Sequence, residues 1–79
     1  MNHTEQTLIT MSAKLDKLLV EQETIIHSNK TFQLKIELSE ILMTDMANIG
    51  LKIHSLLDSL REQGGMSEEC FNILHPNYF

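Results

Sequence analysis

The side chains with the greatest chemical potential in this sequence are one cysteine and four histidines. Cys70 and His75 lie five residues apart, and His54 precedes them on what we expect to be the neighbouring helix. Thiolate and imidazole suit zinc, so these three residues form the candidate metal set. However, the sequence lacks the paired Cys-x-x-Cys or His-x-x-x-His spacing of a zinc motif. We therefore predict no metal or cofactor site.

Cys70 is also the candidate nucleophile. A catalytic thiol needs a nearby base and a lowered pKa. A position in the first turn of a helix would lower the pKa of Cys70, but the adjacent Glu68 and Glu69 act in the opposite direction. The other carboxylates are spread along predicted solvent-facing surfaces, and there is no glycine-rich phosphate loop. We predict that the chain is not an enzyme.

Charge and composition narrow the classes of partner. The chain has 79 residues and a formal net charge of −5, with 11 acidic residues and 6 scattered basic ones. Nucleic-acid backbones and anionic membranes require clustered Lys and Arg, so both are disfavoured. No stretch approaches the roughly 18 apolar residues of a membrane span, and the first ten residues do not resemble a signal peptide. We expect a cytoplasmic protein with a single domain over residues 1–79.

Apolar residues recur at helical spacing through most of the chain. Written as one heptad frame, the core positions run from residue 8 to residue 60. The polar exceptions are Gln22, Asn29, Ser39 and Gly50. This periodicity predicts an all-α protein.

A break in the pattern divides the long helical region in two. Residues 27–31 contain no apolar side chain and are rich in turn and cap formers. We predict a helical hairpin, with a helix over about 4–27, a turn over about 28–31 and a second helix over about 32–62. If the chain does not bend there, the alternative is a continuous coiled-coil rod.

The C-terminal part has clear boundary signals. Gly64-Gly65 predicts the end of the second helix. Ser67 is a good N-cap for a short helix over about 67–74. Because His75 precedes Pro76, we expect extended backbone at the start of a tail over 75–79.

The second long helix is apolar over more than half of its circumference. One partner helix cannot cover so wide a surface, so we predict dimerisation into a four-helix bundle. The same face is the predicted binding site for a larger protein. Its residues are Leu34, Leu38, Ile41, Leu42, Met46, Ile49, Ile53 and Leu56. The leading functional hypothesis is a small acidic protein-interaction module: a regulator, adaptor, chaperone or inhibitor.

Residues 31–38 allow a second interpretation, because polar and apolar residues alternate strictly there, as in a strand. Ser39 could then cap a helix that ends at Gly50. This order of strand, helix, turn and helix over residues 31–63 resembles the ribbon-helix-helix repressors. The resemblance implies a paired ribbon in the DNA major groove, with Gln33 and Lys35 as its DNA-binding residues.

Overall fold

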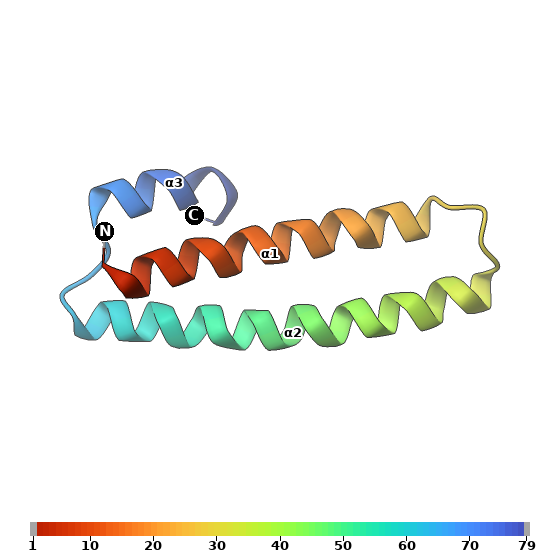
Figure 1. Ribbon diagram of the computed structural model, residues 1–79, viewed down its shortest axis with the longest axis horizontal. Coiled ribbons are helices and arrows are strands. Elements are labelled where there is room, and N and C mark those ends of the chain that lie inside the picture. Colours follow the sequence, from red (N-terminus) through yellow and green to blue (C-terminus); the bar gives the residue numbers. More distant parts are fainter. Residues whose placement is uncertain (1, 79) are drawn as a thin grey trace.

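The computed structural model describes the backbone of residues 2–78 and the side chains of residues 2–74. All regular structure in this part of the chain is helical: α1 is His3–Ile26, α2 is Phe32–Glu62 and α3 is Glu68–Tyr78. The two long helices lie side by side and antiparallel, and α3 runs beside the first half of α1 (Figure 1). The predicted all-α hairpin with a short third helix is confirmed, and the continuous rod is wrong.

α1 begins at a capping box. The Asn2 side chain accepts a hydrogen bond from the backbone N–H of Glu5 at 2.9 Å, and the Glu5 carboxylate accepts one from the backbone N–H of Asn2 at 3.2 Å. These bonds satisfy donors that the first turn of a helix otherwise leaves unpaired. At the other end of α1, the Ser28 hydroxyl donates to the carbonyl oxygen of Ile25 at 2.7 Å, where the chain leaves the helix.

Residues 31–38 form the N-cap and first turns of α2 rather than a strand. The Thr31 hydroxyl accepts a hydrogen bond from the backbone N–H of Leu34 at 3.3 Å. The Lys35 ammonium donates to the carbonyl oxygen of Ile26 at 2.8 Å and so ties α2 to the end of α1. A capped helix satisfies its own backbone groups, whereas a strand needs a neighbouring strand. The ribbon-helix-helix fold is therefore wrong for this chain.

The end of α2 depends on two glycines. Gly64 and Gly65 have φ angles of 101° and 105°, a region that disfavours residues with a Cβ. The Gly65 N–H donates to the carbonyl oxygen of Leu60 at 2.8 Å, and the Gly64 N–H donates to that of Arg61 at 3.3 Å. This pair of bonds is the Schellman pattern, which satisfies the last carbonyls of a helix and turns the chain away.

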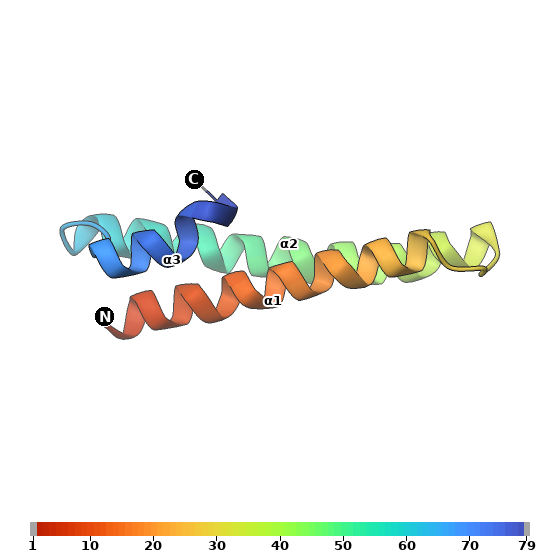
Figure 2. The ribbon, with the colours of Figure 1, turned by 90° about the horizontal axis from the view of Figure 1, so that it is seen from above.

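α3 extends beyond the predicted end near Leu74. The helix continues to Tyr78, so the extended backbone predicted at His75 is wrong. A proline within a helix, such as Pro76 here, removes one backbone donor and in general bends the helix without always ending it. Figure 2 shows that the last part of α3 turns out of line with its first part. Phe79, the last residue of the predicted tail, lies outside the described residues.

The buried core lies at one end of the hairpin. Leu8, Leu60, Cys70 and Leu74 form one cluster, and each is at most 3% exposed. Partly buried apolar side chains surround this cluster: Ile9, Ile53, Leu56, Leu57 and Met66. We call this end, which α3 covers, the closed end, and the end formed by residues 27–31 the turn end. Among the described apolar side chains outside this cluster, Leu42 is the buried one.

A buried carboxylate joins α3 to the start of α1. Glu5 is 3% exposed and accepts hydrogen bonds from the Ser67 backbone N–H at 2.8 Å and the Ser67 hydroxyl at 2.5 Å. The Ser67 oxygen also accepts a bond from the backbone N–H of Cys70 at 3.2 Å, as an N-cap does. The hydrogen bonds from Ser67 lower the pKa of Glu5, because they stabilise its charged form.

Candidate interaction surface

The eight residues predicted to bind a partner are divided between the seam of the hairpin and its surface. Leu42 is buried, whereas Leu34 and Ile41 are exposed. The other five are partly buried: Leu38, Met46, Ile49, Ile53 and Leu56. Together with Leu42, these five recur every three or four residues, so they share one face of α2. This face packs against α1, and most of the predicted set is therefore already covered within the chain.

The two residues predicted for DNA binding are engaged within the helices. Gln33 Nε2 donates to the Glu37 carboxylate at 3.2 Å, one helical turn away. Lys35 Nζ bonds to the carbonyl oxygen of Ile26. The strand that would have presented both side chains to a major groove is part of α2.

The candidate metal and thiol residues do not converge on a described site. His54 is exposed and lies 3.5 Å from the Asp58 carboxylate, whereas Cys70 is fully buried in the core. The side chain of His75 lies outside the described residues. Among the described side chains, no three His, Cys, Asp or Glu gather as metal ligands would. Burial, followed by the charge of Glu5, raises the pKa of Cys70, which disfavours the reactive thiolate.

On one side of the hairpin, each long helix carries a line of residues spaced three or four apart. The line on α1 comprises Leu8, Ser12, Leu15, Leu19, Gln22 and Ile26. The line on α2 comprises Leu60, Leu57, Ile53, Gly50, Met46, Met43, Ser39, Ile36 and Phe32. This spacing keeps each line on one side of its helix. Both lines begin in the core beside α3, since Leu8 and Leu60 belong to its cluster.

Past the end of α3, the same lines are open to solvent. Phe32 is 79% exposed, Met43 is 56% exposed and Ile26 is 50% exposed, and Leu19 and Ile36 are exposed as well. We call these five residues the turn-end surface. Four of them line one groove, whose full lining is Ile26, Phe32, Lys35, Ile36, Ser39, Glu40 and Met43. Contiguous exposed apolar side chains of this kind mark binding sites when they form a large patch with a polar rim.

The rim of the turn-end surface carries more negative than positive charge. Glu40 lines the groove, and Glu23 lies beside Ile26 and Leu19 on the adjoining surface of α1. Both carboxylates are exposed. Lys35 also lines the groove, and its ammonium, which donates to the carbonyl oxygen of Ile26, keeps its positive charge. A molecule bound in the groove would therefore meet two carboxylates and one ammonium, which together carry a net negative charge.

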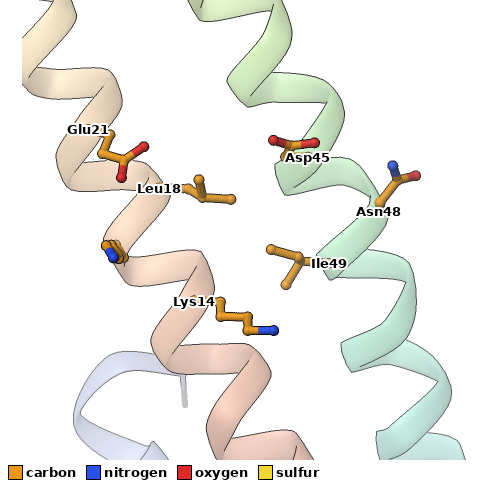
Figure 3. Close-up of a pocket in the computed structure, with 7 residues that line it drawn as sticks. Lys14, Leu18, Glu21, Asp45, Asn48 and Ile49 are labelled. Carbon is orange, nitrogen blue, oxygen red and sulfur yellow. The ribbon is translucent and has the colours of Figure 1, made fainter.

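The opposite side of the hairpin is more polar. Figure 3 shows Leu18 of α1 and Ile49 of α2 directed toward each other, surrounded by charged side chains. The polar residues lining this second hollow are Lys14, Lys17, Glu21, Asp45 and Asn48. Leu34 and Ile41 are exposed on the same flank of α2 as Asp45. Ile41 lies seven residues after Leu34 and four before Asp45, so helical geometry places all three on one side of the helix. They are apolar controls for residues of the turn-end surface.

Sequence reasoning did not single out Phe32 and Ile36 as binding residues. The usable signal was their spacing of four, followed by Met43 seven residues after Ile36, which places all three on one flank of a helix. Leu19 and Ile26 have the same spacing of seven on the first helix.

No family model, curated protein or solved structure matches this chain. None of the described helices combines the length and apolar character that crossing a membrane requires.

Proposed function

We propose that this chain is a small acidic protein-interaction module that binds another protein through the turn-end surface. A regulator, adaptor, chaperone or inhibitor of a larger protein would work in this way. One observation supports the proposal above the others. Mainly apolar residues follow one side of the hairpin from the closed end to the turn end, yet α3 covers that side only at the closed end. The remaining exposed part is a surface that a partner would bury.

A homodimer would use the same surface. The sequence predicted a four-helix bundle because α2 is so widely apolar. In the folded chain α1 covers the seam face of α2, so the exposed apolar residues of α2 are left for a second copy, and those of the turn-end surface are among them. Self-association and partner binding would then compete for the same five side chains.

Site-specific photo-crosslinking in the native host tests the proposal. A photoreactive amino acid replaces Ile36 in one variant and Ile41 in a matched control. Both positions are exposed on α2, at 37% and 61%, but they lie on opposite flanks. We expect a discrete adduct with another protein from position 36 and little or none from position 41.

Two results would contradict the proposal. One is the absence of any adduct at position 36 in a chain whose circular dichroism shows the native helix content. The other is equal labelling of the same protein from both flanks, because a contact confined to the turn-end surface cannot produce it.

A further inference from the structure

The closed end shows what covers this side of the hairpin. α3, a helix of 11 residues, lies there and places Cys70 and Leu74 against Leu8 and Leu60. Cys70 and Leu74 are four residues apart, so they form one apolar stripe on α3. The turn-end surface continues the lines that begin at Leu8 and Leu60. A second helix with a comparable stripe would therefore extend the layer that α3 begins.

The size of the turn-end surface matches a short helix. From Phe32 to Met43 the groove follows α2 for about 16 Å, at roughly 1.5 Å per residue. A bound helix of about three turns spans that length, which is also the length of α3. Such a helix would present apolar residues three and four positions apart to Phe32, Ile36 and Met43.

The charge of the rim distinguishes between two occupants. A second copy of the chain would bring its own Glu23, Glu40 and Lys35 to the interface, and a two-fold contact sets the same surface against itself. The two surfaces would then carry the same net negative charge and would repel each other. Lysine or arginine beside the apolar stripe of a foreign helix would instead complement these carboxylates.

We propose that the turn-end surface binds a basic amphipathic helix of another protein, about three turns long, with Lys or Arg on both sides of an apolar stripe. This inference rests on the proposed function and adds the chemistry of the partner. Burial of the stripe in the groove provides most of the affinity, while Glu23 and Glu40 select for positive charge beside it.

Designed peptides of about 18 residues, long enough to form a helix on binding, provide the probe. The first has leucines three and four residues apart on one face and lysines beside them. The second replaces these lysines with glutamates. The third has the composition of the first in scrambled order. Fluorescence anisotropy with the full chain measures each dissociation constant, and we expect only the first peptide to bind well.

Two pairs of charge reversals locate the rim. Glu23→Lys with Glu40→Lys should weaken binding of the first peptide about tenfold, because two favourable pairs become two repulsions. Glu21→Lys with Asp45→Lys changes the net charge equally on the opposite side of the hairpin. This control should change binding less than about threefold, since separated exposed charges are screened by salt. Circular dichroism verifies that both double variants are folded.

Several results would overturn the inference. If the glutamate peptide binds as well as the first, the partner helix does not need basic residues beside its apolar stripe. If the scrambled peptide binds as well, the contact depends on net charge and not on an amphipathic helix. If light scattering shows a dimer and Phe32→Glu dissociates it, the turn-end surface binds a second copy of the chain. Failure of all three peptides, with the crosslink at position 36 intact, overturns this inference and leaves the proposed function standing. Loss of the crosslink itself would overturn the proposed function.

Discussion

The two ends of the hairpin share the same helices but differ in what covers them. At the closed end, α3 completes a cluster in which Leu8 and Leu60 are almost fully buried. At the turn end, the corresponding side chains on the same side of the hairpin are open to solvent, with Phe32 the most exposed. Burial of apolar area stabilises a fold, whereas exposed apolar area is available for association. The buried core and the turn-end surface therefore lie at opposite ends of one structure.

The sharpest way to break this comparison is a pair of alanine substitutions. We expect Leu60→Ala to lower the free energy of unfolding by about 2–4 kcal/mol, because it leaves a cavity in the core cluster. Phe32→Ala should change it by no more than about 0.5 kcal/mol, because its side chain is already exposed. Urea denaturation followed by circular dichroism measures both. Equal losses in the two variants would show that the turn end is covered in solution.

Alanine substitutions at two glycines should change the free energy of unfolding in opposite directions. Gly65→Ala should destabilise the chain by about 1–2 kcal/mol, because alanine resists the left-handed conformation found there. Gly50 lies inside α2, and a Cβ added to it would meet no atom within 4 Å. Gly50→Ala should therefore stabilise the helix by about 1 kcal/mol. Thermal unfolding gives the order, and a loss of stability in Gly50→Ala would indicate an unseen close approach at this position.

We expect a smaller effect from pH on the contribution of the closed end to the free energy of unfolding. Ser67 lowers the pKa of Glu5 in the folded chain, so the charged carboxylate stabilises the fold. This stabilisation is complete when the pH is above 4.5, the ordinary pKa of the group. It is lost as the pH falls below that value through the lowered folded pKa. Wild type should lose stability more steeply than Glu5→Gln in this range, as measured by urea midpoints between about pH 7 and pH 3. Parallel curves would show that the carboxylate charge does not hold α3.

The smallest expected effect concerns the turn. Asn29 is exposed between the two long helices and outside both of them. Asn29→Leu should change the free energy of unfolding by no more than about 0.5 kcal/mol. Small-angle scattering should give an unchanged radius of gyration, which is 15.2 Å for the Cα atoms of the structure. Elongation together with a gain in stability would show that the sequence can also adopt the continuous rod.

Local signals predicted most of the helix boundaries, because the groups that cap a helix are adjacent to it in sequence. Thr31 and Ser67 each accept a backbone hydrogen bond at a helix start, and Gly64-Gly65 turns the chain after α2. The end of α3 was not predictable by the same rule. Pro76 disfavours helix at the preceding residue, but this local preference is weak enough for the helix to continue.

The candidate site was harder to predict because its residues produce a misleading pattern. Residues two apart on a helix point in nearly opposite directions, so strict alternation spreads apolar side chains around α2. Phe32 and Ile36 fall on one flank, while Leu34 falls on the other. In a strand the same alternation would have put all three on one face. Which flank is covered depends on the position of α3, a tertiary fact that no local window contains.

The contact between Glu5 and Ser67 has a consequence for how the chain matures. These residues are 62 positions apart, so the first turn of α1 is synthesised long before Ser67, which donates hydrogen bonds to the Glu5 carboxylate. Contacts between α1 and α2 near the 27–31 connection join residues that are close in sequence, so they can form early. The core of the closed end also needs α3, which is synthesised after both long helices. During that interval Leu8 and Leu60 have no cover from α3. A hairpin that lacks α3 therefore exposes apolar residues at both of its ends until α3 docks.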